Sequence, residues 1–286
     1  MSVVVTGYAS LDYAMQLDSP PQPDRTATIL SRPAEWPRLG GSPAYVAAAL
    51  VAAGAQDVAP VSWVGDDAEG ATYRSGLEAL GVRTDGIAAA GGRTPVCILA
   101  YPPDGRCHCL YDPGLTAQAG LSERQGALID AAEAVCVAVG PPQATWETLR
   151  RARPDAALVW AVKADPRAVP PDLAAALAAR ADVVAFSLGE DDFVARAFAA
   201  ADARAAERLR IETRGREGAA YMQNGVTRIV RADPVDADDT TGAGDTFAGG
   251  FLAAWILNRD PEAAVAAGAA AARALLLARA GPARRS

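Results

Sequence analysis

The chain has 286 residues, of which 51% are hydrophobic, so it can bury a full core as one large domain or as one domain with a small appendage. Its formal net charge of −7 argues against nucleic acid as the main partner, because phosphate backbones are bound by basic patches. The N-terminus lacks the cationic start and apolar stretch of a signal peptide, and the helical run 261–280 is too short for a good membrane span. We therefore expect a soluble protein without a membrane partner.

Short apolar runs alternate with helical segments along most of the chain. The expected strands are 3–6, 58–64, 134–139, 157–162, 182–186, 209–213 and 226–230. The expected helices before the last of these strands are 43–53, 68–80, 121–132, 145–152, 170–180 and 190–208. This alternation predicts an α/β fold, with a Rossmann-like, mostly parallel sheet flanked by helices. Ligands of such sheets bind outside the carboxyl ends of the strands.

Two segments interrupt the alternation, within residues 13–38 and 94–115. The first is rich in proline around a short strand-like piece, 26–30. The second reads as a hairpin whose turn contains Asp104 and Gly105. We expect the strands of both segments to leave the main sheet and to form a small β lid on a single domain that spans residues 1–286.

The four cysteines are Cys97, Cys107, Cys109 and Cys136, and two of them flank the only histidine, His108. This spacing does not fit a zinc knuckle, and no second pair of ligands completes a site. We interpret the cysteines as reduced thiols of a cytoplasmic protein. A single histidine without an active-site context also argues against a Ser-His-Asp or Cys-His hydrolase.

The most informative segment is DDTTGAGDTFAGGF, residues 238–251, which enters an apolar-periodic helix. Gly242 and Gly244 let the backbone approach a ligand closely, and their amides, with that of Ala243, lie at a helix start, where an anion is favoured. Asp245 would repel a phosphate there. That cost makes sense if its carboxylate accepts the proton of a hydroxyl group that attacks the phosphate.

Two other phosphate-binding loops do not fit this segment. A Walker A loop needs a Gly-Lys-Ser/Thr sequence, and a dinucleotide fingerprint needs a glycine where Phe247 stands. The remaining alternative is a glycine-rich helix start without a function. In it Thr240 or Thr241 would cap the helix, and Asp245 would be a favourable acid in the first turn.

The sequence DTTGAGD at 239–245 resembles a motif that the ribokinase-like (PfkB) kinases carry near their C-terminus. Four further segments resemble that family in the same order, namely GYASLD at 7–12, LGGSPAYVAAALVAAGA at 39–55, WVGDDAEG at 63–70 and TRGREGA at 213–219. The resemblance implies a Rossmann-like domain, a β lid that often mediates homodimers, ATP and Mg²⁺ as cofactors, and phosphoryl transfer to the hydroxyl group of a sugar or nucleoside.

The resemblance also implies roles for individual residues. Asp245 would be the catalytic base, and Gly242, Ala243 and Gly244 would form the anion hole. The acceptor would be held by Asp12, Gly40 and Gly41, with Tyr45 beside them. The nucleotide site would include Thr213, Gly215, Ser187 and Lys163. Glu190 would order Mg²⁺ through water, and the main chain near Asp239 would contribute to a monovalent-cation site for K⁺.

Two positions depart from the family pattern. Tyr45 stands where the family usually has an asparagine, which offers both a donor and an acceptor to a sugar diol. Tyr45 either packs in its helix or changes the acceptor pocket. Ser187 replaces the asparagine of an Asn-x-x-Glu motif whose Glu190 is retained. Lys163, the only lysine, follows an apolar strand and is either a solvated charge or a phosphate contact.

The sequence therefore predicts an ATP-dependent kinase that transfers the γ-phosphoryl group to a hydroxymethyl group. Hexoses, pentoses, sugar acids and nucleosides all remain open as acceptors. The alternative is a non-catalytic sugar- or nucleotide-binding protein on the same fold, which the departures at Tyr45 and Ser187 favour and the intact DTTGAGD motif opposes. A dehydrogenase is a more distant alternative.

Overall fold

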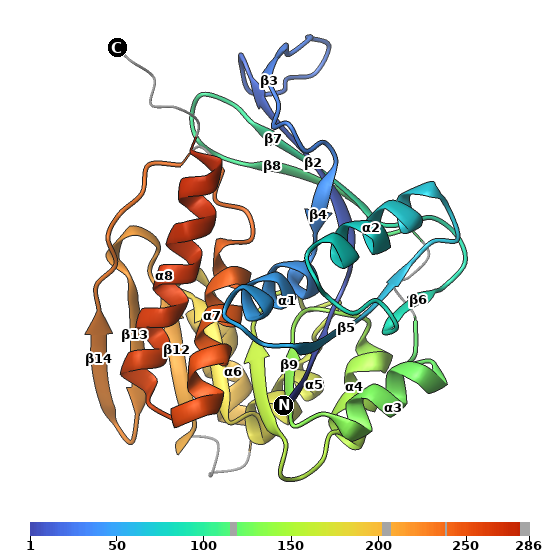
Figure 1. Cartoon of the computed structure of the whole chain (residues 1–286). Coiled ribbons are helices and arrows are strands. Elements are labelled where there is room, and N and C mark those ends of the chain that lie inside the picture. The colour runs from blue at the N-terminus through green and yellow to red at the C-terminus, as the bar shows by residue number, and fades with distance from the viewer. Residues whose placement is uncertain (115–118, 202–206, 238, 281–286) are drawn as a thin grey trace.

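The computed structural model describes residues 1–114, 119–201, 207–237 and 239–280 (Figure 1). Residue 115 of the expected lid segment, residues 202–206 of the expected helix 190–208, and Asp238 of the glycine-rich motif lie outside the described residues. The predicted α/β fold is confirmed. Helices flank a nine-stranded sheet, and a separate five-stranded sheet stands beside its upper end in Figure 1.

The main sheet has the strand order β14-β13-β12-β11-β10-β9-β1-β5-β6. Its strands are β1 Ser2–Thr6, β5 Asp57–Val64, β6 Ile87–Ala89, β9 Ala134–Val137, β10 Ala157–Ala161, β11 Val183–Ser187, β12 Leu209–Thr213, β13 Ala219–Gln223 and β14 Val226–Val230. The strands from β6 to β12 are parallel, whereas β13 and β14 add antiparallel pairs at the edge. All seven predicted strands are present; β6 and β13 were not predicted.

Helices cover both faces of this sheet because its central strands bury side chains on either side. The helices are α1 Ser42–Ala52, α2 Ala68–Ala79, α3 Glu123–Ala131, α4 Pro142–Arg151, α5 Pro171–Arg180, α6 Asp191–Ala200, α7 Ala243–Asn258 and α8 Pro261–Arg279. Val3 and Val5 pack in the core with α1, α2, α7 and α8, whereas Val4 packs with α3 to α6. This alternation is the side-chain period of a strand that is buried on both faces.

The second sheet, which we call the lid, has the order β3-β2-β7-β8, with β4 paired to β2. Its strands are β2 Ser10–Leu17, β3 Ile29–Ser31, β4 Arg38–Gly40, β7 Val96–Tyr101 and β8 His108–Asp112. The hairpin predicted around Gly105 is β7 and β8, which pair antiparallel. Since β2 follows β1 after three residues, the lid is tied directly to the centre of the main sheet.

The lid also holds the Cys107-His108-Cys109 sequence. The sulfur atoms of Cys97 and Cys109 lie 3.3 Å apart on neighbouring strands, and all four cysteines are free. Among the described residues there is no group of three or more His, Cys, Asp or Glu side chains that could hold a metal ion.

Helix α8 is long and apolar enough to cross a membrane, judged by its length and composition alone. In the structure one of its faces packs against α7 and strand β13, with Ala264, Val265 and Gly268 buried. The core helix of a soluble protein passes the same test, so the length of α8 is weak evidence for a membrane span.

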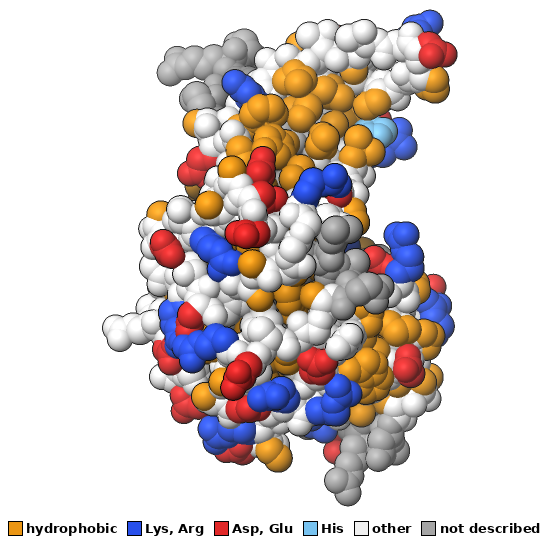
Figure 2. Space-filling model, turned by 90° about the vertical axis from the view of Figure 1, so that its right-hand side faces the viewer, with side chains coloured by type: hydrophobic (Ala, Val, Ile, Leu, Met, Phe, Trp, Pro, Cys, Tyr) orange, Lys and Arg blue, Asp and Glu red, His pale blue; other side chains and the backbone are white. Residues whose placement is uncertain are grey.

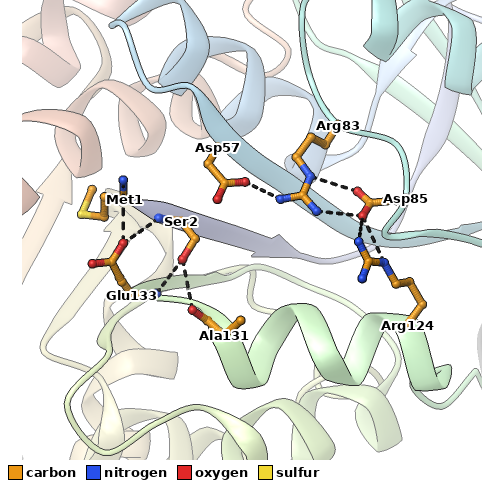
Figure 3. A network of polar contacts seen from close by, with 8 residues as sticks. All are labelled: Met1, Ser2, Asp57, Arg83, Asp85, Arg124, Ala131 and Glu133. Carbon is orange, nitrogen blue, oxygen red and sulfur yellow. Dashed lines mark hydrogen bonds and ion pairs between the residues drawn. The ribbon is translucent and has the colours of Figure 1, made fainter.

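Charged side chains tie the strands together at their amino ends (Figure 3). The backbone amide of Ser2, at the start of β1, donates to Glu133 just before β9, at 2.8 Å. Arg83 pairs with Asp57, the first residue of β5, and with Asp85. These pairs are partly exposed, so each contributes about 0–1 kcal/mol. They lie at the end of the sheet opposite to that where parallel sheets bind ligands.

Helix α7 packs very closely against both α1 and α8, because small residues line both contacts. A Cβ atom at Gly249 would lie 2.6 Å from the carbonyl oxygen of Val46 and 2.7 Å from the Cβ atom of Ala49, both on α1. On the other side, a Cβ atom at Gly250 would lie 2.6 Å from that of Ala271 on α8. The close approach fixes the position of α7 relative to α1.

We predict that Gly249→Ala lowers the free energy of unfolding by about 1–3 kcal/mol, because the new methyl group overpacks a contact with rigid backbone. Gly189→Ala is the matched control, since a Cβ atom there meets no atom within 4 Å. Chemical denaturation of both variants measures the difference. Equal stability of the two variants would contradict the close approach of α1 and α7.

Candidate active site

The candidate site lies where the carboxyl ends of the central strands meet the first turns of two helices. The connection after β1 leads through α1 on one face of the sheet, and the connection after β9 leads through α4 on the other face. A crevice opens at such a switch in direction. Gly41 is the N-cap residue of α1 and Gly242 is that of α7, so the amides of two helix starts lie here.

The start of α7 needs a glycine at position 242. Gly242 has a φ of 75°, in the left-handed region, and a Cβ atom there would lie 2.6 Å from ring atoms of Tyr45. The amide of Ala243 donates to the carbonyl oxygen of Thr240 at 3.1 Å, so an anion bound at this loop would compete with that bond. The loop is therefore shaped by Tyr45 as well as by its own glycines.

Asp245 lies on the first turn of α7 and is only partly exposed. Burial raises the pKa of its carboxyl group, and a hydrogen bond with Ser42 and the charge of Lys163 lower it in part. The like charges of Asp12 and Glu190 raise it further. Residues from the lid, from α1 and from the ends of β10 and β11 thus converge on one carboxylate whose affinity for a proton is increased, as a base requires.

The residues expected to bind the nucleotide line the carboxyl ends of β10, β11 and β12. Glu190 accepts hydrogen bonds from the backbone amides of Ala164 and Ser187, both at 2.9 Å, and so joins the ends of β10 and β11. Ser187 lies opposite Thr213 in the register of β11 and β12. Lys163, Ser187 and Gly215 are exposed, which leaves this edge accessible to a ligand.

Asp12 lies on the other side of the crevice, in β2 of the lid, and is only 3% exposed. Its carboxylate accepts a hydrogen bond from the Ser10 hydroxyl group at 2.8 Å and a long one from that of Tyr45 at 3.5 Å. A Cβ atom at Gly40 would lie 2.0 Å from the carboxylate, so the glycine makes room for it. Burial raises the pKa of Asp12, and the nearby charge of Asp239 adds to that effect.

Tyr45 points toward the acceptor side of the site and does not pack away from it. Its ring covers Gly242, and its hydroxyl group, besides contacting Asp12, accepts a hydrogen bond from Nη2 of Arg279 at 3.2 Å. The Arg279 guanidinium group also lies 5.5 Å from the centre of the ring. Of the two interpretations of this position, the structure supports a side chain that shapes the pocket between the lid and α7.

An ion cluster centred on Asp239 was not predicted from the sequence. Its carboxylate is 2.5 Å from Nη1 of Arg38 in the lid and 3.9 Å from Nη1 of Arg279 at the end of α8. The Tyr101 hydroxyl group and the Thr241 amide also donate to it, at 2.8 and 3.0 Å. The side chain of Asp239 is therefore fully engaged, so only the main chain near it remains for the expected cation site.

The local sequence around each arginine of this cluster gives no indication that its side chain is buried in an ion pair. Arg38 stands two residues before the glycine pair and Arg279 near the end of an Ala-rich helix, and each reads as a solvated surface charge. In the structure their side chains are only 8% and 15% exposed. Their role depends on a partner that is distant in sequence.

A cavity of about 1170 Å³ adjoins the cluster, between the lid and the ends of α1 and α8. Its wall includes Gln16, Arg38, Tyr45, Tyr101, Asp239 and Arg279. Because Tyr45 and Arg38 also lie beside Asp12, the cavity extends the acceptor side of the crevice away from Asp245.

Asp239→Asn should lower the free energy of unfolding at pH 7 by about 2–4 kcal/mol, because it leaves the buried Arg38 without its counter-charge. Burial raises the pKa of Asp239, but the hydrogen bond and charge of Arg38 outweigh it and lower that pKa to about 2. A lowered pKa stabilises the folded state above the unfolded value of 3.8, and the contribution is lost as pH falls toward 2.

Denaturant titrations of wild type and Asp239→Asn from pH 7 down to pH 2 test this expectation. The stability difference should stay constant down to about pH 4 and then shrink. A difference that does not change with pH would mean that the carboxylate is not paired as described.

Comparison with known proteins relates the chain to a group of kinases. A family model described as pfkB family carbohydrate kinase matches residues 2–282. The ATP-dependent ribose-1-phosphate kinase of Halopiger xanaduensis is 31% identical over 271 residues, which covers 92% of this chain and 88% of that protein.

Solved structures of kinases share the fold at lower identity. The nucleoside kinase of Methanocaldococcus jannaschii, described as an archaeal member of the ribokinase family, matches with a TM-score of 0.82 and 19% identity, covering 97% of this chain and 92% of that one. Ribokinase of Thermotoga maritima matches with a TM-score of 0.80 and 20% identity, over 98% and 94% of the two chains. Arabidopsis thaliana ribokinase, complexed with ribose and ATP, matches with a TM-score of 0.78 and 19% identity, covering 96% of this chain and 92% of that one.

Proposed function

The chain belongs to the pfkB family of carbohydrate kinases, and from this and the site we propose that it transfers the γ-phosphoryl group of ATP to the hydroxymethyl group of a sugar, sugar derivative or nucleoside. The observation that carries the proposal is Asp245, a carboxylate of raised pKa on the first turn of α7. The non-catalytic alternative is not favoured, because the matching family and relatives are kinases.

We propose that Asp245 accepts the proton of the acceptor hydroxyl group while that oxygen attacks the γ-phosphorus atom of ATP, whose bond to the β–γ bridging oxygen breaks so that ADP leaves. The helix-start amides at Gly242, Ala243 and Gly244 face the charge that develops on the transferred group, and Lys163 adds a positive charge from the end of β10. Asp12, Gly40 and Gly41 hold the acceptor on the lid side. ATP binds along Ser187, Thr213 and Gly215, at the open edge of the sheet.

The proposal includes Mg²⁺, which supplies positive charge to the β- and γ-phosphates when bound. Glu190 fits an indirect role only, since both of its oxygens already accept backbone hydrogen bonds and their remaining lone pairs can bind water. Mg²⁺ keeps several waters in such sites. A K⁺ ion on main-chain carbonyls near Asp239 would share this loop with Arg279, whose Nη1 already donates to the Thr241 carbonyl oxygen.

We also propose a homodimer formed through the lid and a cytoplasmic location. Figure 2 shows hydrophobic side chains gathered on the lid, in the upper part of the view. The large exposed hydrophobic residues of the lid strands are Ile29, Leu30, Ile98, Leu110 and Tyr111. A patch of this kind favours burial against a second copy. The four free cysteines support a reducing compartment.

The relative from Halopiger suggests a phosphorylated pentose as the acceptor. Tyr45 supports a substituted sugar over a simple one, because its ring fills space between Asp12 and Gly242 where an asparagine would offer two polar groups. A ribose 1-phosphate keeps a free hydroxymethyl group at the far end of its ring, which suits the reaction proposed for Asp245.

Asp245→Asn tests the catalytic assignment. It keeps the size of the side chain and removes the base, so turnover should fall by about 10²-fold or more while the affinity for ATP changes little. ADP release with a panel of sugars, sugar phosphates and nucleosides measures turnover. In the wild type the rate should fall with decreasing pH at a midpoint above the ordinary carboxyl value, because burial raises the pKa of Asp245. Near-normal turnover of the variant would refute the assignment.

Tyr45→Asn tests the choice of acceptor. Restoring the usual family residue should shift relative kcat/KM toward unsubstituted sugars by about 1–3 kcal/mol, because the amide adds polar contacts and the ring no longer fills the pocket. Tyr45→Phe is the control, since it keeps the ring on Gly242 and should preserve the ranking of acceptors. An unchanged ranking of the acceptors in Tyr45→Asn would show that Tyr45 does not determine the choice of acceptor.

A further inference from the structure

Arg38 is a buried cation with only part of its hydrogen-bonding capacity in use. Its Nη1 atom pairs with Asp239, but Nε and Nη2 have no hydrogen-bond partner among the described residues and are shielded from solvent. The residue as a whole is only 8% exposed. Buried donors without a partner cost about 1–3 kcal/mol, and more when they are charged. A protein that keeps such donors needs a reason for them, and an anionic ligand supplies one.

The geometry of the unused donors specifies the kind of anion. Nε and Nη2 form one edge of the planar guanidinium group, and this edge matches two oxygens of a phosphate or carboxylate. Nη1 lies on the other side and is held by Asp239, which fixes the orientation of the group. Arg38 is therefore anchored by one nitrogen and keeps two parallel donors without a protein partner among the described residues.

The charges around Arg38 also favour an anion. Two guanidinium groups, those of Arg38 and Arg279, share the single carboxylate of Asp239. Asp12 is the next acid, and its carboxylate already accepts hydrogen bonds from Ser10 and Tyr45. The other acids on the cavity wall, Glu35 and Asp236, are exposed, and Asp236 already pairs with Arg216. The cluster itself carries a net positive charge inside a chain whose net charge is −7.

We propose that Arg38, supported by Arg279, binds a phosphate group that the acceptor already carries, so that the substrate is a sugar phosphate and the product a bisphosphate. This inference rests on the proposed kinase function. Asp12 lies opposite Arg38 in the pairing of β2 with β4, and its charge also reaches Asp245. A sugar held at Asp12 with its hydroxymethyl group toward Asp245 therefore extends its other end toward Arg38 and the cavity.

Tyr45 completes this subsite. Its hydroxyl group lies between Asp12 and Arg279, and together with the Tyr101 hydroxyl group and Gln16 it lines the same cavity. The side-chain amide of Gln16 can donate to phosphate oxygens that Arg38 does not reach, whereas the two tyrosine hydroxyl groups already donate to Asp12 and Asp239 and shape the wall of the subsite. Tyr45, which stands where the family usually has an asparagine, and the unpaired edge of Arg38 thus belong to the same binding site. Its ligand is a phosphate monoester at the end of the sugar opposite to the reacting hydroxymethyl group.

The test compares two acceptors that differ in one substituent, which is a phosphate group in ribose 1-phosphate and a methyl group in methyl ribofuranoside. Both keep the hydroxymethyl group free. ADP release gives kcat/KM for each acceptor with wild type, Arg38→Lys and Arg210→Lys. Arg38→Lys keeps the charge beside Asp239 but loses the paired donors, so kcat/KM for ribose 1-phosphate should fall about 10- to 100-fold while that for the methyl riboside changes little.

Arg210→Lys is the matched control. Arg210 is also partly buried with an unpartnered Nε atom, but it lies on β12 against Phe198, outside the cavity. It should leave the ratio of the two acceptors unchanged. Thermal unfolding establishes that both variants are folded. If Arg38→Lys does not fold, the wild type alone tests the proposal. The proposal requires its kcat/KM to be higher for ribose 1-phosphate than for the methyl riboside.

Equal losses for both acceptors in Arg38→Lys would show a purely structural role for Arg38 and overturn the subsite, as would a wild type that prefers the methyl riboside. Calorimetric titration of ribose 1-phosphate into the enzyme without ATP separates the subsite from the kinase function. If no acceptor yields ADP, the kinase proposal fails. Binding that Arg38→Lys weakens would then still support the subsite, and absence of binding would overturn it.

Discussion

One partly buried carboxylate, that of Asp239, joins three parts of the molecule that are far apart in the sequence. Arg38 comes from the lid, Arg279 from the end of the last helix, and Asp239 itself from the loop that opens α7. Removing the Asp239 carboxylate would leave both arginines uncompensated in a poorly solvated place. The position of the lid over the crevice and the shape of the glycine-rich loop therefore depend on the same set of contacts.

The second constraint is the close packing of α1, α7 and α8. Small side chains let these helices approach until backbone meets backbone, as at Gly249 and Gly250. Gly41 and Gly242 are the N-cap residues of α1 and α7, so the amides of the two helix starts are fixed relative to each other. Phosphoryl transfer is favoured by hydrogen-bond donors that do not have to reorganise during the reaction. Rigid helix starts provide such donors.

In this acidic chain, a few cations lie where we propose that phosphate groups bind. Lys163 stands at the end of β10, on the Asp245 side, and the two arginines of the Asp239 cluster stand on the lid side. Tyr45 lies between these regions, with its ring on the loop of α7 and its hydroxyl group on Asp12 and Arg279. A change at this one position can thus alter both the loop and the pocket.

The sequence by itself determined the features that are encoded locally. Alternating apolar runs gave all seven predicted strands, and the short motif at 239–245 identified the loop and Asp245, because glycines, helix starts and hydrophobic periods act over a few residues. Strand β6 has only three residues, too few for a recognisable period. The ion pairs of Arg38 and Arg279 left no trace in spacing, since they join residues that only the folded sheet, lid and last helix bring together. Only the tertiary structure decided that Tyr45 faces the pocket and that a buried arginine edge lies unpaired beside Asp12.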